Sequence, residues 1–270
     1  MKACIIALLS IPPLAWAQPA LAPPQLGFVE DSASALRPAY GVAGNFILGP
    51  SVASNIVSEA FSGSFGFLKT DSSLAVFDSQ GKLLASLDAA PGPALFAFSA
   101  SGTTGLVYIA STRAFIEWSG TAFAPIPASY ELPTGDTVMA IAFPNPSQAS
   151  LFVRRNARDP NDGLWQVNVP LGAAGSASQV ALNGVRAPVL ALPSGTLVFS
   201  GSAGIVIRAT DASEIHIAAS LPTQFSLEQM NQDWVQLIDL NSPARLAIRT
   251  TSGRESVYRL PQVASGVVQQ

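Results

Sequence analysis

The chain contains a single histidine, His216, in the alternating stretch Glu214-Ile215-His216-Ile217. A Ser-His-Asp hydrolase needs an imidazole base whose second nitrogen is oriented by a carboxylate. On a strand, His216 and Glu214 would share one face and the two isoleucines would share the other. The polar face of an outer strand explains this pattern, and no serine lies in a G-x-S-x-G motif. The sequence therefore argues against a hydrolase triad.

Carboxylates are the second group that could do chemistry, because glycoside hydrolysis uses a pair of them across a pocket. The acidic residues that could contribute are Glu30, Asp31, Glu59, Asp78, Glu117 and Asp233. Asp31, Asp78 and Glu117 recur at comparable places in predicted hairpins, which is typical of residues that flank turns. Spacing alone puts no two carboxylates on one wall of a pocket. We therefore predict no catalytic residue; whether the protein is an enzyme stays open, and the sequence leans against it.

The most charged stretch of this charge-poor chain runs from Arg154 to Gly163, with the sequence RRNARDPNDG. Its Asp and Asn spacing resembles part of a calcium loop but lacks the distal bidentate Glu of an EF-hand. We expect an elongated, solvated hairpin tip and predict no metal site. The functional alternative is a recognition loop, in which Arg154, Arg155 and Arg158 bind a carboxylate or an anionic sugar.

Aromatic side chains offer a further binding surface. Tyr40 and Tyr130 lie in predicted connections rich in Gly and Pro, where they could contact a sugar or a peptide. The tryptophans at 118, 165 and 234 lie in or beside predicted strands, so we expect them to pack in the core. The two tyrosines complete the set of predicted binding residues.

The composition excludes several classes of function. One His and one Cys cannot form a His/Cys metal site or a disulfide framework. A net charge of −3, with only three lysines, argues against a nucleic-acid partner or a polybasic membrane surface. The high apolar content argues against disorder. We expect no cofactor and a monomeric protein.

The first seventeen residues have the pattern of a secretory signal peptide. Lys2 precedes an apolar run, and Ala15-Trp16-Ala17 forms an A-x-A cleavage site before Gln18. The prolines at 12 and 13 interrupt the run before it reaches the length of a membrane anchor. We predict cleavage after Ala17, a Pro/Ala linker over 18–25, and a secreted or periplasmic product without a transmembrane span.

The rest of the chain consists of short apolar or alternating runs separated by Gly, Ser, Asn, Asp and Pro, which predicts an all-β domain. One type of hairpin begins near residues 55, 94, 137, 187 and 233, and a second type lies between its copies. Two hairpins per period of roughly 45 residues correspond to the four-stranded blade of a β-propeller. A β-sandwich also has many short strands, but it gives no reason for two hairpin types to alternate.

These units predict a β-propeller of five four-stranded blades, or of six if residues 26–48 form a unit of their own. We expect a single domain over 26–263 and a tail over 264–270. The last unit contains only one clear strand after its first hairpin, SVYRL at 256–260. We therefore predict that the N-terminal hairpin, Leu26 to Pro38, pairs with the C-terminal blade and closes the ring, which removes exposed sheet edges.

One segment departs from this pattern. Ser226 and Gln229 fit a capping box, and Met230, Trp234 and Leu237 follow at helical spacing. The sequence predicts a short helix over 226–234, ahead of a strand.

The alternating hairpins and their period resemble secreted bacterial β-propeller repeat proteins over roughly residues 26–262. The stretch LAVFDSQGKLLASL at 74–87 is similar to the D-x-x-G-K hairpin of quinoprotein-type blades, but the tryptophan docking motif of those proteins does not recur. The G-H and W-D pairs of WD40 blades and the double glycine of kelch blades are also missing. No functional residue of any one family can therefore be transferred.

Of the functions that remain, we favour a secreted, non-catalytic module that binds a protein, a peptide or a glycan. One alternative is a carbohydrate-active enzyme, a glycosidase or lyase, with carboxylates at the propeller channel. Another is a structural protein of the cell envelope. Propellers perform many unrelated functions, so the fold alone does not choose among them.

Overall fold

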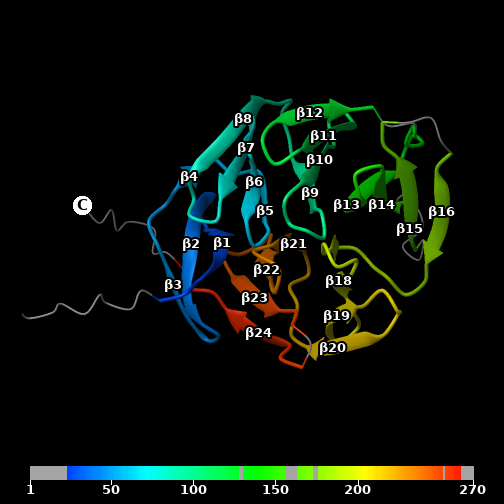
Figure 1. The fold of residues 1–270 in the computed structure, drawn as a ribbon. Coiled ribbons are helices and arrows are strands. Elements are labelled where there is room, and N and C mark those ends of the chain that lie inside the picture. Colours follow the sequence, from blue (N-terminus) through cyan, green and yellow to red (C-terminus); the bar gives the residue numbers. More distant parts are fainter. Residues whose placement is uncertain (1–22, 128–129, 156–162, 173–175, 252, 263–270) are drawn as a thin grey trace, which may run out of the picture.

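The protein is described here by a computed structural model that covers residues 23–127, 130–155, 163–172, 176–251 and 253–262. This part of the chain forms 24 strands and no helix. The strands make six separate four-stranded antiparallel sheets arranged around a central axis, with the first and last sheets side by side (Figure 1). The predicted all-β propeller is confirmed.

The first three blades follow the chain in order. Blade 1 contains β1 (Gln25–Glu30), β2 (Ala35–Val42), β3 (Asn45–Leu48) and β4 (Ala53–Ser54). Blade 2 contains β5 (Ser58–Phe61), β6 (Phe65–Lys69), β7 (Ser73–Asp78) and β8 (Leu83–Asp88). Blade 3 contains β9 (Ala94–Phe98), β10 (Gly105–Ile109), β11 (Ala114–Trp118) and β12 (Phe123–Ile126).

The other three blades complete the ring. Blade 4 contains β13 (Thr137–Asn145), β14 (Gln148–Arg154), β15 (Leu164–Pro170) and β16 (Ser178–Leu182). Blade 5 contains β17 (Val189–Ala191), β18 (Leu197–Ser200), β19 (Gly204–Arg208) and β20 (Glu214–Ala218). Blade 6 contains β21 (Phe225–Gln229), β22 (Trp234–Asp239), β23 (Arg245–Arg249) and β24 (Ser256–Arg259).

The middle strands are mainly apolar because both of their faces are covered by neighbouring blades. In β10, all residues are buried: Val107 and Ile109 pack against blade 2, whereas Leu106 and Tyr108 pack against blade 4. Successive side chains of a strand point to opposite faces, so one strand serves two interfaces. Six apolar clusters, one for each pair of neighbouring blades, close the ring.

The predicted number of five blades is wrong, and the six-bladed alternative is confirmed. The predicted helix over 226–234 is also wrong, because these residues form β21, a turn and the start of β22. This second error explains the first. Once β21 is counted as the inner strand, blade 6 has four strands of its own and needs none from the N-terminus.

The predicted closure by strand pairing is therefore wrong as well. The N-terminal hairpin forms blade 1, where β1 pairs with β2 and where β3 and β4 both pair with β2. Blade 1 meets blade 6 through an apolar cluster that includes Val29, Phe46 and Trp234. Three side chains of blade 6 also donate to backbone carbonyl oxygens of blade 1: Asn231 Nδ2 to Leu26, Gln236 Nε2 to Glu30 (3.1 Å) and Arg245 Nη2 to Asp31 (3.4 Å).

The inner strand of blade 1 runs in the opposite direction to its two neighbours. The start of β1 lies beside the ends of β5 and β21, around Phe61 and Met230. Its end at Glu30 lies beside the start of β5, at Val57, and beside Ser226 of β21. Because β1 runs opposite to β5 and β21, the turn between β1 and β2 lies at the end of the ring where β5 and β21 begin.

Candidate functional site

Three glutamates from three blades meet where blade 1 is inserted between blades 2 and 6. Glu30 ends β1, Glu59 lies in β5, and Glu228 lies in β21. Glu59 is only 3% exposed, and its Oε2 has no hydrogen-bond partner in the described part of the chain. Glu228 is partly exposed as a residue, but its Oε2 is likewise shielded and unpartnered among the described residues. We call these three residues the glutamate cluster.

Strand alternation explains why these side chains converge. In β5, Ala60 packs against blade 3, so its neighbours Glu59 and Phe61 point to the other face, toward blade 1. In β21, Leu227 packs against blade 5, so Glu228 points toward blade 1 from the opposite side. The reversed β1 brings Glu30 between them.

Burial and mutual repulsion hold protons on this cluster. Burial raises the pKa of Glu59 well above its usual range, and the Glu228 and Glu30 carboxyls raise it further. Burial also raises the pKa of Glu228 to about 8, with Glu30 adding to the shift. The pKa of Glu30 is raised by burial too, although Ser34 and Arg245 oppose the change. Groups with such shifts are more frequent at functional sites than elsewhere.

Polar side chains beside the cluster and in the channel wall are only partly satisfied. Gln229 and Gln236 are almost completely buried, and Gln229 Nε2 and Gln236 Oε1 have no partner in the described structure. The guanidinium of Arg245 donates to Asp31 O and, at 3.5 Å, to Ala244 O, while its Nε is unpartnered among the described residues. Native proteins rarely leave such groups unpaired.

A channel of about 500 Å³ runs beside the cluster, and Glu59, Glu228 and Gln229 lie in its wall. The inner strands of blades 2 to 6 line it, whereas blade 1 does not reach it. Its other side chains are mainly apolar: Val57, Leu95, Phe96, Met139, Ile141, Val189, Leu190, Phe225, Leu227 and Leu240. An apolar concavity with a few converging polar groups is the common form of a small binding site.

An acidic recess of about 610 Å³ lies on the blade 1 side of the same cluster. Glu30, Glu228, Asp239 and Arg245 line it together with serines of blades 1 and 6. Hydrogen bonds from Ser242 and the Asn241 amide lower the pKa of Asp239. Glu228 and three further residues, Val57, Ser226 and Leu240, line both the recess and the channel. The cluster therefore lies where an acidic space meets an apolar one.

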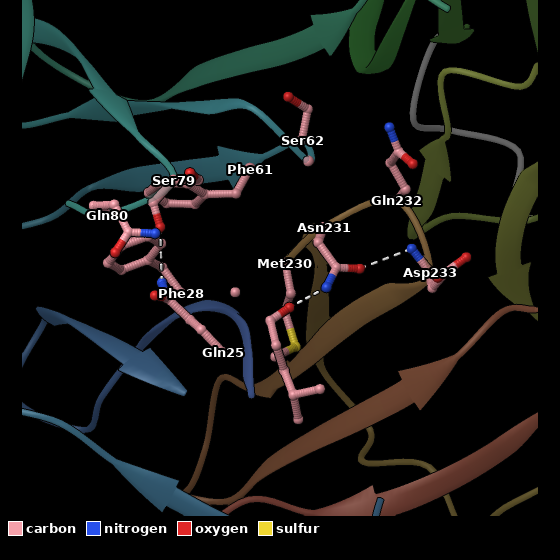
Figure 2. A pocket seen from close by; sticks show the side chains of 13 residues that line it. Gln25, Phe28, Phe61, Ser62, Ser79, Gln80, Met230, Asn231, Gln232 and Asp233 are labelled. Atoms are coloured by element: carbon pink, nitrogen blue, oxygen red, sulfur yellow. Dashed lines mark hydrogen bonds between the residues drawn. The ribbon is translucent and has the colours of Figure 1, made fainter. Parts of the chain in front are cut away.

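A third concavity, of about 360 Å³, lies where β5 and β21 end (Figure 2). Its polar groups serve mainly to hold blade 1 in place. Gln25 Nε2 donates to Ser79 O at 3.0 Å, and Asn231 joins the Leu26 carbonyl to the turn that precedes Trp234. Phe28 and Phe61, which also line it, are buried and stacked at 4.6 Å. We interpret this pocket as part of the ring closure.

The predicted arginines lie on blade 4, away from the cluster. Arg154 is exposed at the end of β14. The Arg155 guanidinium lies 4.0 Å from the centre of the Trp165 ring, contacts Gln179, and has its Nε 4.0 Å from Asp136. Arg158 is outside the described residues. Their predicted role in binding stays a prediction.

The two predicted tyrosines are not close together. Tyr40 lies in β2 rather than in a connection, opposite Gln25 and Ile47 on the neighbouring strands. Tyr130 lies in the connection before β13, near Asp136 and Arg155, and burial raises its pKa. Its hydroxyl is buried without a partner in the described part of the chain. The structure brings Tyr130 to Arg155 but places Tyr40 on another blade.

The other chemical candidates lie on an outer strand, in turns and within β11. His216 and Glu214 share a face of the outer strand β20, with Nε2 and Oε2 3.2 Å apart and the His216 side chain 69% exposed. Asp31 and Asp78 accept backbone hydrogen bonds in their turns, as predicted. Glu117 does not flank a turn, because it lies within β11.

Sequence reasoning named Glu30 and Glu59 as carboxylates but missed Glu228 and Arg245. Glu228 lies within the helix predicted over 226–234, and that prediction gave it no place on the face of an inner strand. The period-two alternation of Ser226-Leu227-Glu228-Gln229 is the signal that could have revealed it. Within the described ranges, no group of three His, Cys, Asp or Glu side chains has the geometry of a metal site.

No protein-family model matches the chain, and no curated protein sequence matches it. Among solved structures, it is similar to the β-propeller domain of Cps50 (Swd1) from Myceliophteria thermophila, with a TM-score of 0.40, 12% identity, and coverage of 76% of this chain and 70% of the other.

Two further structures are similar. One is PorZ, a bacterial surface component of the type-IX secretion system of Porphyromonas gingivalis, with a TM-score of 0.44, 12% identity, and coverage of 86% of this chain and 31% of PorZ. The other belongs to a nidogen/laminin complex, with a TM-score of 0.49, 10% identity, and coverage of 87% and 92%. At these identities the likeness concerns the fold alone. In the described part of this chain, no helix is long and apolar enough to cross a membrane.

Proposed function

We propose that the protein is a non-catalytic binding module that receives an apolar segment of a partner peptide or protein in the central channel. The observation that carries this proposal is the channel itself, with a volume of about 500 Å³ and walls from five blades. Apolar side chains form most of its wall, which favours an apolar segment over a glycan.

Two features support a segment entering from one end. The channel lies in the part of the ring where the inner strands begin, at Val57, Pro93 and Phe225. Where the same strands end, the concavity is smaller, about 220 Å³, and is lined by Ser62, Ser99, Ser194 and Gln232 among others. An apolar segment would therefore enter at the first end and meet polar groups at the second.

The neutral dye Nile red is a suitable probe for an apolar channel. We expect it to bind, and the substitutions Met139→Gln and Leu190→Gln to weaken its binding about tenfold, because each replaces an apolar wall group with a polar one of similar size. Leu83→Gln and Val180→Gln are matched controls, since these exposed apolar residues lie on the outer strands β8 and β16. Fluorescence titration measures all five proteins.

Peptides selected from a displayed random library should compete with the dye. Equal losses in the channel variants and in the outer-strand controls would overturn the proposal, as would the absence of dye binding. Selected peptides that leave the dye in place would also contradict it, because their site would then lie elsewhere.

A glycosidase is the second candidate, because Glu30 and Glu228 line one recess and one of them holds its proton at neutral pH. Such an enzyme pairs a carboxylic acid with a carboxylate. A panel of 4-nitrophenyl glycosides distinguishes the two functions. A binding module releases no nitrophenolate, whereas turnover that Glu228→Gln abolishes would favour the enzyme.

We also propose that the protein acts outside the cytoplasm, on the basis of its N-terminal sequence; residues 1–22 are outside the described part. Expression of the full chain in a bacterial host tests this. We expect the exported protein to have the mass of a chain that begins at Gln18. A cytoplasmic product that retains Met1 would contradict the proposal.

A further inference from the structure

We propose that the segment bound in the channel carries a basic group, a primary ammonium or a guanidinium, which binds between the carboxyls of Glu59 and Glu228. This inference rests on the proposed function and specifies its ligand. The evidence comes from the position of the two carboxyls, from the charges around them and from the hydrogen-bond acceptors that they leave unused.

The position of the carboxyls suits a cation with an apolar body. Glu59 and Glu228 lie in the wall of an otherwise apolar channel, and Glu228 also faces the acidic recess. An aliphatic chain could remain in the channel while its charged end reaches the cluster. Long basic side chains bury their methylene groups in this way while the charge stays in a polar environment.

Full ionisation of the glutamate cluster would leave more negative than positive charge around it. Glu30 adds a third carboxyl, and Asp239 lies at the recess. Arg245 is the cation that acts on all three glutamates. The other nearby cation, Arg37, is engaged with Asp31, with Nε 2.5 Å from Oδ2. Among the described residues, one guanidinium therefore faces three carboxyls, so the buried carboxyls keep their protons in the free protein, and a cationic ligand would replace those protons.

The unused hydrogen-bonding groups support the same ligand. Glu59 Oε2, Glu228 Oε2 and Gln236 Oε1 are buried acceptors without partners in the described structure. An ammonium has three donors and a guanidinium has five, so either could satisfy these oxygens. Gln229 Nε2, a buried donor in the channel wall, is available to a peptide carbonyl oxygen.

Such binding should depend on pH. The carboxyls must ionise to bind a cation, whereas burial and their mutual repulsion keep them protonated in the free protein. Binding therefore releases protons, and affinity should rise as pH rises toward about 8, the pKa of Glu228. Each proton released gives up to about a tenfold change per pH unit, until a ligand amine loses its own proton near pH 10.

Matched probes that differ in their head group test this inference on the full mature chain. Octylammonium, octanol and octanoate compete with Nile red at pH 6 and pH 8. We expect the dissociation constant of octylammonium to fall at least tenfold between these pH values, and that of octanol to stay unchanged. Octanoate should bind more weakly than octanol at pH 8.

The variants Glu59→Gln and Glu228→Gln replace each carboxyl with a neutral group of the same shape. We expect both to keep the affinity for octanol, to lose at least tenfold in octylammonium affinity at pH 8, and to lose the pH dependence. Glu117→Gln, in β11 of blade 3, is the matched control and should behave as the unmodified protein. Circular dichroism checks that each variant is folded.

The outcomes separate the inference from the proposed function. If octanol binds in the channel as tightly as octylammonium at pH 8, or if the glutamine variants bind octylammonium as tightly as the unmodified protein does, the proposal of a basic group is wrong and the apolar channel remains. If no probe binds, both fall. A further comparison tests whether the basic group belongs to a peptide or to a small amine. It uses an acetylated apolar heptapeptide with a central Lys and the same peptide with norleucine in place of that Lys. A tenfold preference for Lys supports a peptide, and a preference confined to octylammonium indicates a small amine instead.

Discussion

Two regions of the ring differ in the side chains that fill the space between blades. One is the interface between blades 2 and 3, and the other is the junction of blades 6, 1 and 2. Between blades 2 and 3, Phe65, Phe67, Phe96, Phe98 and Trp118 form a continuous aromatic cluster. At the junction around blade 1, apolar clusters exist on both sides, but three glutamates lie between them. Inner strands that run in parallel bring equivalent faces together, whereas the reversed β1 leaves an irregular space that polar groups occupy.

The largest expected effect lies in the aromatic interface. Phe67 is fully buried and stacks on Phe96 and Phe98, with ring centres 5.5 and 5.3 Å away. We expect Phe67→Ala to lower the free energy of unfolding by about 3–5 kcal/mol. Phe46→Ala at the blade 1–6 interface should cost less, because Phe46 lies nearer the surface. Urea unfolding measures both, and a larger loss for Phe46→Ala would reverse the comparison.

A smaller effect should follow from crowding at the ring closure. Gly27 has a φ of +147°, and a Cβ there would lie 2.4 Å from the Met230 carbonyl oxygen. We expect Gly27→Ala to cost roughly 1–3 kcal/mol, because blade 1 must move away from β21. Gly92→Ala is the control: its φ of +96° carries backbone strain, but nothing lies within 4 Å of the added methyl. Equal losses of unfolding free energy in the two variants would contradict this prediction, because blade 1 could then move away from Met230 without a cost in stability.

A further expected effect is a difference in pH dependence that grows between the ordinary pKa of a glutamate and the raised pKa of Glu228. An unfolded glutamate ionises near pH 4.5, whereas folded Glu228 ionises near pH 8. The folded state therefore loses stability as pH rises through this window, by at most about 1.4 kcal/mol per pH unit for one group. We expect Glu228→Gln to equal the unmodified protein near pH 4 and to exceed it in stability at pH 8, in urea titrations at both pH values.

A control of opposite sign accompanies this measurement. Arg208 lowers the pKa of the Glu214 carboxyl, so Glu214 contributes stability that is lost as pH falls. Glu214→Gln should therefore be slightly less stable than the unmodified protein at pH 8. Parallel pH curves for Glu228→Gln and the unmodified protein would contradict the protonated glutamate cluster.

Local patterns predicted most of the strands and few of the long-range relations. The hairpins that begin near residues 55, 94, 137 and 187 are the first hairpins of blades 2 to 5. The fifth, near 233, is instead the middle hairpin of blade 6, because β21 had the spacing of a helix. Met230 and Trp234 are buried against blade 1 rather than on one face of a helix. That single misreading changed both the number of blades and the closure.

The candidate site shows the same limit. Glu30 and Glu59 stand out as carboxylates beside predicted strands, but their partner Glu228 lies far along the chain. The predicted arginines and tyrosines lie in segments that the sequence marks as charged or rich in turn residues. Such segments are visible in a sequence, whereas a buried carboxyl in an inner strand looks like any other polar residue.

The amino-acid sequence by itself determined the all-β class, the repeated hairpins and the turns around Asp31 and Asp78, because these depend on alternation and on local hydrogen bonds. The tertiary structure decided the six blades, the reversed direction of β1 and the meeting of Glu30, Glu59 and Glu228. These features depend on which apolar faces of distant strands cover one another. Hydrophobic burial is non-directional, so an apolar pattern in the sequence does not specify which distant strand will cover it.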